Sequence, residues 1–283
     1  MRILVSNDDD ITARGIKVLA QRLAMDPENE VYVCAPDRER SATGHALTLH
    51  KPLRVEEVDM GPNIKGAWLT TGTPSDCVKF ATGCLLKERP DFVVSGANSG
   101  PNLGGEILYS GTVSAAMEGA FLDIPSIAVS VAGGGYHRNY EGAAEFVAGL
   151  LKTLKTAQFI VGKTLLNVNV PNLPSDQIKG VAVTKLGVRA YNDYFEKRVD
   201  PRGKVYYWLA GEAIEGGEEE NTDCWTVAHD MISITPIQFN MTDFNMMEKL
   251  SQFKLPEVHK HGSQTPAIGH RDAPSSVVNK DAK

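Results

Sequence analysis

The chain opens with Met1-Arg-Ile-Leu-Val-Ser-Asn-Asp-Asp-Asp10, and this stretch decides the fold. Ile3 to Val5 form a short apolar run of the kind found in strands that are buried on both faces of a parallel sheet. The run ends abruptly in acidic residues, and apolar residues with helical spacing follow from Ile16 to Leu23, with Thr12 as a candidate N-cap. We therefore predict a strand, a polar turn and a helix, the opening of a βαβ unit.

The same alternation continues through the first two thirds of the chain. Apolar runs at 30–35, 91–95, 124–131 and 164–170 have strand character, and helical patterns at 74–89, 112–121 and 140–154 lie between them. The helix at 74–89 has a well-marked start, because Thr73 can cap it, Pro74 suits its first turn and Asp76 can complete a capping box. The pattern predicts an α/β fold with a Rossmann-like, doubly wound and mostly parallel sheet.

The C-terminal third has a different pattern. Beyond about Asp176, short β-like pieces at 181–186, 191–198, 205–209 and 231–234 are separated by turns, and such hairpins have exposed edges that can pair with another subunit. Residues 251–283 contain few large apolar side chains, which is typical of a mobile tail. We predict a catalytic core at 1–178, a C-terminal β-hairpin arm for oligomerisation at 179–250 and a tail at 251–283.

Composition limits the classes of function and the compartment. The formal net charge of -6 argues against a surface that coats a nucleic acid polymer. The 4 Cys residues show no zinc-binding spacing, and Cys77 and Cys84 fall on one helix face where core packing explains them. Neither a signal peptide nor an apolar run of bilayer length is evident, so we expect a cytoplasmic protein without a membrane partner.

Polar loops follow three of the predicted strands, at 7–10, 38–45 and 96–105. In a doubly wound sheet these loops open on one edge, so side chains that are distant in sequence can meet there. The oxygen donors that could meet are those of Asp8, Asp9, Ser41 and Asn98. Hard oxygen ligands suit Mg²⁺ or Mn²⁺ and do not suit a structural zinc. Taken alone, however, the acidic turn is equally consistent with a solvated turn.

The triplet Ser110-Gly111-Thr112 stands at the start of a predicted helix. Free backbone N–H groups, the positive end of the helix dipole and two hydroxyl groups favour an anion, so this triplet is a candidate phosphate site. An ordinary serine or threonine N-cap explains the same residues. His45 is a candidate acid or orienting residue, although lone histidines more often have structural roles.

Several longer motifs occur in a characteristic order. They are Ser-Asn-Asp-Asp at 6–9, Ala-Pro-Asp-Arg-Glu-Arg-Ser-Ala-Thr-Gly at 35–44, Thr-Thr-Gly-Thr-Pro-Ser-Asp-Cys-Val at 70–78, Ser-Gly-Ala-Asn-Ser-Gly-Pro-Asn-Leu-Gly at 95–104 and Tyr-Ser-Gly-Thr-Val-Ser-Ala-Ala-Met-Glu-Gly at 109–119. Together they resemble the SurE survival-protein family of metal-dependent nucleotidases, and the resemblance extends to about Leu250.

The resemblance implies a function and a set of site residues. It implies hydrolysis of nucleoside 5'- and 3'-monophosphates, a Rossmann-like core and a swapped C-terminal arm in a homodimer or homotetramer. One divalent cation per subunit, Mg²⁺ or Mn²⁺, is expected on Asp8, Asp9, Ser41 and Asn98. Asp8, Asp9 and Asn98 are the expected catalytic residues. The expected phosphate contacts are Asn98, Ser110, Gly111 and Thr112.

One position departs from the family pattern, which continues the acidic pair with glycine where this chain has Asp10. Glycine would permit a positive φ, whereas aspartate adds bulk and negative charge where a phosphate must approach. We therefore expect poor turnover, and a nucleotide-binding module with little turnover is one alternative function. Another is a haloacid-dehalogenase-like phosphatase with Asp8 as nucleophile, because Asp8-x-Asp10-x-Thr12 matches that motif, although no later acidic pair is evident.

Overall fold

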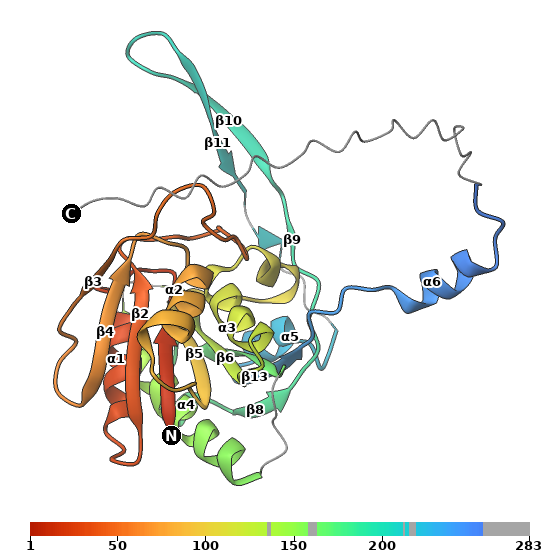
Figure 1. Cartoon of the computed structure of the whole chain (residues 1–283). Coiled ribbons are helices and arrows are strands. Elements are labelled where there is room, and N and C mark those ends of the chain that lie inside the picture. The colour runs from red at the N-terminus through yellow and green to blue at the C-terminus, as the bar shows by residue number, and fades with distance from the viewer. Residues whose placement is uncertain (135–136, 158–162, 212, 215–218, 257–283) are drawn as a thin grey trace, which may run out of the picture. The chain divides into compact units, whose positions relative to one another are not determined.

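The computed structural model describes residues 1–134, 137–157, 163–211, 213–214 and 219–256. Its centre is a nine-stranded sheet with the order β3-β4-β2-β1-β5-β6-β7-β13-β8 (Figure 1). The strands are β1 (Arg2–Ser6), β2 (Glu30–Pro36), β3 (Val55–Glu57), β4 (Ile64–Thr70), β5 (Phe92–Ser99), β6 (Ser126–Ala132), β7 (Leu165–Pro171), β8 (Gly180–Val183) and β13 (Met231–Ile237). All neighbouring strands are parallel except the pairs β3–β4 and β7–β13.

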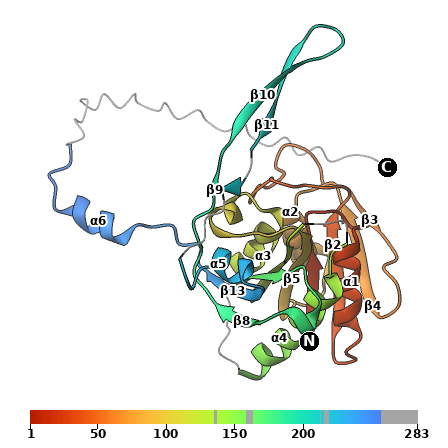
Figure 2. The same cartoon turned by 180° about the vertical axis from the view of Figure 1, so that it is seen from behind.

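Helices cover both faces of this sheet, as Figures 1 and 2 show. On one face α1 (Arg14–Ala24) packs against α4 (Tyr140–Ala157), and on the other α2 (Pro74–Phe80) packs against α3 (Gly111–Phe121). From β1 the chain moves in one direction to β2 and β4, and it then returns to β5 on the other side of β1. The predicted doubly wound α/β fold is confirmed, and its strand order reverses between β1 and β5, where such folds bind ligands.

The opening strand supplies both halves of the core. Ile3 and Val5 lie in the hydrophobic cluster beneath α1 and α4, and Leu4 lies in the cluster beneath α2 and α3. All three side chains are fully buried. Each contributes about 1.5–3 kcal/mol relative to an exposed side chain, so the first apolar run anchors the sheet from both sides.

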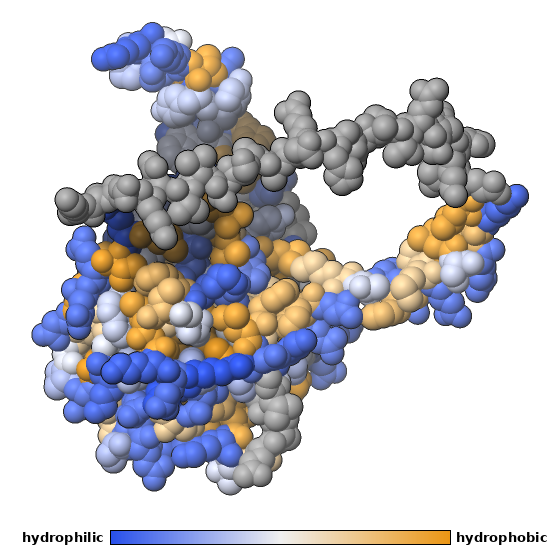
Figure 3. All heavy atoms as spheres, in the orientation of Figure 1, coloured by the Kyte–Doolittle hydropathy of each residue, from blue (hydrophilic) through white to orange (hydrophobic). Residues whose placement is uncertain are grey.

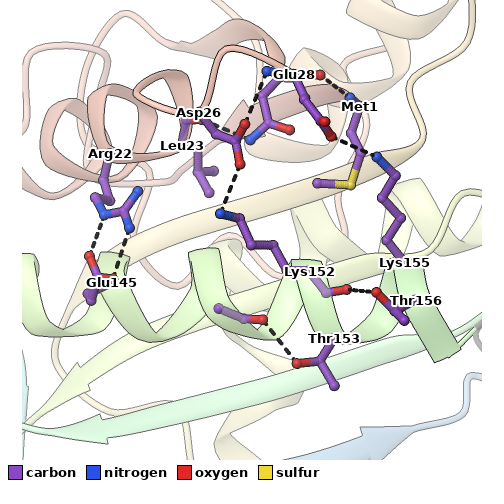
Figure 4. A network of polar contacts seen from close by, with 12 residues as sticks. Met1, Arg22, Leu23, Asp26, Glu28, Glu145, Lys152, Thr153, Lys155 and Thr156 are labelled. Atoms are coloured by element: carbon purple, nitrogen blue, oxygen red, sulfur yellow. Dashed lines mark hydrogen bonds and ion pairs between the residues drawn. The ribbon is translucent and has the colours of Figure 1, made fainter.

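A network of charged side chains joins α1 and the turn after it to α4 (Figure 4). Arg22 forms an ion pair with Glu145, Asp26 with Lys152 at 3.0 Å, and Glu28 with Lys155 at 3.4 Å. Solvent screens pairs at the surface, so their contribution to stability is small. The apolar contacts beneath them hold the two helices together.

Five corrections to the sequence predictions concern local structure. The helix predicted for 74–89 ends sooner, because α2 passes into a π-helical turn at Ala81–Leu85 and the chain is extended at Leu86. Residues 47–49, whose alternation of apolar and polar side chains predicts an extended strand, form none, and β5 continues to Ser99 through part of the predicted loop. Thr12 is not the N-cap of α1, since Ala13 occupies that position and the Thr12 hydroxyl donates to Asp10. Cys77 is buried as predicted, whereas Cys84 is exposed. The capping box of Thr73 and Asp76 is confirmed.

The region after β7 combines core strands with a hairpin. β8 and β13 belong to the nine-stranded sheet. β10 (Tyr194–Val199) and β11 (Val205–Ala210) form the predicted C-terminal hairpin, whose exposed side chains include Phe195 and Trp208. The remaining elements are β9 (Ala190–Tyr191), β12 (Ala213–Ile214), α5 (Asp223–Ala228) and the 3-10 turns Gly104–Leu108 and Ser175–Gln177.

Residues 240–283 form a separate compact unit from residues 1–239. Its helix α6 (Phe244–Ser251) has no buried residue, and the hydrophobic surface of this segment is visible in Figure 3. Of the predicted tail at 251–283, residues 257–283 lie outside the described residues. Among the described helices, none combines the length and apolar character needed to cross a membrane.

Candidate functional site

The turn after β1 brings two carboxylates to the point where the strand order reverses. Asp8 is buried and Asp9 is half-buried. The backbone oxygen of Asp8 accepts a hydrogen bond from Arg40 N at 2.7 Å, and its Oδ1 accepts one from the hydroxyl of Thr112. A Cβ atom on Gly111 would lie 2.7 Å from Asp8 Cβ, so glycine lets the start of α3 approach this closely. The turn, the loop after β2 and the start of α3 therefore meet at Asp8.

The end of β5 lies against the second carboxylate. Ser99 N donates to Asp9 Oδ2 at 3.3 Å, which places the preceding residue, Asn98, beside the acidic turn. Asn98 Nδ2 donates to Gly100 O at 2.9 Å. In the described part of the chain, Asn98 Oδ1 accepts no hydrogen bond. The amide oxygen of Asn98 is thus available to a ligand.

The loop after β2 adds a third carboxylate. Ser41 Oγ donates to Glu39 Oε1 at 2.7 Å, and no hydrogen bond among the described residues joins Ser41 to either aspartate. The negative charge of Glu39 contributes to raising the pKa of both Asp8 and Asp9. Sequence reasoning did not single out Glu39, although it lies two residues before Ser41 in the polar loop.

Burial and charge repulsion dominate the electrostatics of the acidic turn. Burial raises the pKa of Asp8 although hydrogen bonds from Thr112 oppose it, and burial together with the charge of Asp8 raises the pKa of Asp9 to about 6. Among the described residues, neither carboxylate has a Lys, Arg or His ion-pair partner. Two adjacent carboxylates without a positive partner favour a bound cation.

The donor types define which cation fits. Within the described ranges, no group of three or more His, Cys, Asp or Glu side chains is arranged to hold a metal ion. A metal at this turn therefore needs the neutral oxygens of Ser41 and Asn98, or water, beside the two carboxylates. Such a set of oxygen donors fits Mg²⁺ or Mn²⁺.

The start of α3 has a capping role. Ser110 Oγ accepts a hydrogen bond from Val113 N at 3.0 Å, so the N-cap interpretation of Ser110 is correct. The hydroxyl of Thr112 is engaged by Asp8. Any phosphate site here would therefore use the backbone N–H of Gly111 and the hydrogen of the Ser110 hydroxyl.

Asp10 has the backbone conformation that glycine adopts readily. Its φ is +109°, and its Oδ1 accepts a hydrogen bond from Thr12 Oγ1 at 2.6 Å. Asn7 Nδ2 donates to Asp10 O at 2.6 Å. This position thus has a positive φ, which aspartate tolerates at a cost in strain.

A further ion-pair cluster centres on a buried carboxylate. Glu118, on α3, is paired at 2.8 Å with both His45 Nε2 and Lys79 Nζ. Burial acts to raise the pKa of Glu118, but the hydrogen bonds from His45 and Lys79 outweigh it and leave the pKa below its ordinary value. His45, a candidate acid in the sequence, therefore contacts Glu118 and forms no hydrogen bond to the described aspartates. A single acid within an otherwise apolar helical stripe was the signal for this cluster.

Comparison with known proteins identifies the family. A model of the family described as survival protein SurE matches residues 3–193. A relative from Thermosynechococcus vestitus named 5'-nucleotidase SurE is 52% identical in an alignment of 259 residues, and the match covers 89% of this chain and 96% of the relative. A second relative, from Gloeobacter violaceus and with the same name, is 53% identical over 244 residues. That match covers 86% of this chain and 91% of the relative. The crystal structure of the SurE protein from Aquifex aeolicus has a TM-score of 0.76 and 40% identity, and the match covers 89% of this chain and 98% of that one. Because the family model matches well over half of the sequence, this chain belongs to the SurE family.

Proposed function

We propose that this chain hydrolyses nucleoside 5'- and 3'-monophosphates to nucleoside and phosphate, with one divalent cation, Mg²⁺ or Mn²⁺, per subunit. Relatives named 5'-nucleotidase SurE, about half identical over most of the chain, support the 5'-nucleotidase activity. The observation that carries the metal dependence is the pair Asp8 and Asp9, which lies at the switch point of the sheet without a cationic side-chain partner among the described residues.

Four residues would hold the cation: Asp8, Asp9, Ser41 and Asn98. The hydroxyl of Ser41 would turn away from Glu39 to reach it, whereas Asn98 Oδ1 needs no such exchange. A divalent cation supplies positive charge against the phosphate and makes a bound water more acidic.

The remaining chemistry belongs to the side chains and the helix start. Thr112 holds the Asp8 carboxylate in place, and Asp8 or Asp9 positions the attacking water and takes its proton. The Gly111 N–H and the Ser110 hydroxyl bind phosphate oxygens at the positive end of α3. Asn98 contacts the phosphate through its amide. Asp8, Asp9 and Asn98 are therefore the proposed catalytic residues.

Asp10 is proposed to slow turnover. Its carboxylate adds negative charge beside Asp8 and Asp9, where the phosphate must approach. We expect Asp10→Gly to release phosphate faster, and unchanged turnover at saturating metal would contradict this. Asp10→Ala is the matched variant, because it also removes the charge but leaves a Cβ at a φ of +109°.

Two alternatives make different predictions. Membership of the SurE family argues against a haloacid-dehalogenase-like reaction with Asp8 as nucleophile. That reaction would pass through a phosphorylated Asp8, which acid quenching of a single turnover with ³²P-labelled nucleotide would trap on the protein, whereas direct water attack leaves the protein unlabelled. A nucleotide-binding module would bind nucleotides with metal and release no phosphate.

We further propose a homodimer or homotetramer in the cytoplasm, joined through the arm that includes β10 and β11. The exposed aromatic side chains of this hairpin support a protein partner. Light scattering during gel filtration would measure the subunit number, and replacement of Phe195 and Trp208 by serine should lower it.

The central test is phosphate release from a panel of nucleoside monophosphates. We expect release with Mg²⁺ or Mn²⁺, loss of release in a chelator, and a rate at least about 100-fold lower for Asp8→Asn. The exposed Asp176→Asn variant is the control for loss of one carboxylate. Equal release by protein stripped of every divalent cation would refute the metal dependence.

A further inference from the structure

A row of polar residues crosses the sheet from the candidate site into the protein interior. Strand pairing aligns Asn98 of β5 with Ser130 of β6, Ser130 with Asn169 of β7, and Asn169 with Ser233 of β13. Ser130, Asn169 and Ser233 are fully buried. Polar side chains are rare at such positions because their burial is unfavourable unless they form hydrogen bonds.

Asn102, in the loop after β5, forms hydrogen bonds with this row of polar residues. Asn102 N donates to Asn169 Oδ1 at 2.8 Å, and Asn102 O accepts from Asn169 Nδ2 at 2.9 Å and from Asn167 Nδ2 at 2.8 Å. Asn102 Nδ2 donates to Ser130 Oγ at 2.7 Å. Three buried side chains thus bind both the backbone and the side chain of Asn102.

These bonds fix a short segment whose other end is at the site. Gly100 N donates to Val131 O at 3.1 Å, and the positive φ of Gly100, +133°, lets the chain fold back over β6. Residues 98–102 are therefore held at Asn98 by strand pairing, at Gly100 by the backbone and at Asn102 by the polar row. The carbonyl of Gly100 in turn accepts from Asn98 Nδ2, so the position of this segment sets the orientation of the Asn98 amide.

We propose that Ser130 and Asn169 are positioning residues, which hold the segment 98–102 so that Asn98 Oδ1 faces the candidate metal site. The inference rests on the proposed function, because it assigns the purpose of the polar row to that site. Outer residues that orient a metal ligand commonly change metal affinity by about 10- to 100-fold when they are replaced.

Strand β6 offers a matched pair of variants. Ser130 and Ser126 are both buried serines of β6, and each hydroxyl forms one short hydrogen bond, Ser126 Oγ to Ile124 O at 2.8 Å. Ser126 lies at the opposite end of the strand from the site. Ser130→Ala and Ser126→Ala therefore remove the same group from the same strand, but only the first change affects Asn102.

The test measures binding of Mn²⁺ alone, from the electron paramagnetic resonance signal of the free ion, together with Tm, kcat and KM. We expect both variants to lower Tm, whereas only Ser130→Ala raises the Kd for Mn²⁺, by about tenfold. Ser130→Cys, which keeps the size and a weak acceptor, should recover part of the affinity and serves if Ser130→Ala fails to fold.

Equal Mn²⁺ affinity in Ser130→Ala and Ser126→Ala would overturn the positioning role while leaving the proposed function intact. A wild-type protein that binds no Mn²⁺ and releases no phosphate would overturn both. The measurement on the wild-type protein therefore distinguishes failure of the positioning role from failure of the proposed function.

Discussion

The hydroxyl of Thr112 donates a hydrogen bond to Oδ1 of Asp8, a residue 104 positions earlier in the chain. Both side chains are buried. The bond joins the start of α3, which follows β5, to the turn after β1. The strand order reverses between β1 and β5. A carboxylate held in this way keeps its orientation when a ligand binds or leaves, which reduces the cost of forming the site.

Thr112→Val should weaken the candidate metal site. Valine has the shape of threonine but leaves Asp8 Oδ1 without its hydroxyl partner, so we expect the Kd for Mn²⁺ to rise about tenfold. Thr112→Ser keeps the hydroxyl and should bind nearly as the wild type does. Calorimetric titration of both variants would decide the matter, and equal loss of affinity would show that the methyl group, not the hydrogen bond, is important.

The Asp9 carboxylate should destabilise the metal-free protein at neutral pH. Its pKa is raised from 3.8 to about 6 in the folded state, so the folded form binds the proton more tightly and stability falls as pH rises from about 4 to about 6. Asp9→Asn should therefore raise the free energy of unfolding at pH 7 in a chelator, by about 1 kcal/mol after allowance for solvent screening.

Urea unfolding at pH 4 and pH 7 would measure this effect. The gain in Asp9→Asn should be present at pH 7 and largely lost near pH 4, where the carboxyl is protonated in the folded state and partly protonated in the unfolded state. The exposed Asp176→Asn variant controls for the loss of a surface charge. A gain of equal size at both values of pH would contradict the explanation.

Glu118→Gln should lower stability with the opposite dependence on pH. The folded-state pKa of Glu118 lies below its ordinary 4.5, so its contribution is complete above about pH 4.5 and is lost as pH falls through the folded value. At pH 7 we expect a loss of about 1.5–3 kcal/mol, the usual contribution of hydrogen bonds to a charged group. The difference between wild type and variant should shrink in urea titrations at progressively lower acidic pH.

Two helical glycines should respond oppositely to alanine. A Cβ on Gly15 of α1 would lie 2.0 Å from the backbone oxygen of Ala97, which is the residue before Asn98. A Cβ on Gly149 of α4 would meet no atom within 4 Å. We expect Gly149→Ala to stabilise the protein by about 0.5–1 kcal/mol and Gly15→Ala to destabilise it by about 1–3 kcal/mol. Thermal unfolding of the two variants measures the sign of each change in stability. A stabilised Gly15→Ala protein would refute the close contact.

Much of the fold followed from the sequence because the alternation of strands and helices is local. The apolar run Ile3 to Val5 predicts a buried strand. Thr73 and Asp76 predict a helix start, because the capping contacts between them lie within four residues. The position of β13 between β7 and β8 did not follow, because nothing in residues 231–237 specifies which distant strand they join. The sequence pattern instead predicts that this segment belongs to the C-terminal arm at 179–250.

The site was partly predictable for the same reason. Topology alone places the turn after β1 and the end of β5 at one edge, and the structure indeed sets Ser99 against Asp9. The contacts of Thr112 and Glu118 depend on side chains from different elements, and no local pattern encodes them. The alternation Asn167-Val168-Asn169 inside a buried strand was a readable signal of the polar row that sequence reasoning did not use.

The antiparallel strand β13 has a consequence for synthesis of the chain. β7 is fully buried in the finished protein, with β6 on one side and β13 on the other. At ribosomal rates of 5–20 residues per second, the roughly 60 residues that separate β7 from β13 take about 3–12 s to translate. During that interval the nascent chain presents an open, apolar strand edge, which is where a chaperone would have to bind if aggregation is to be avoided.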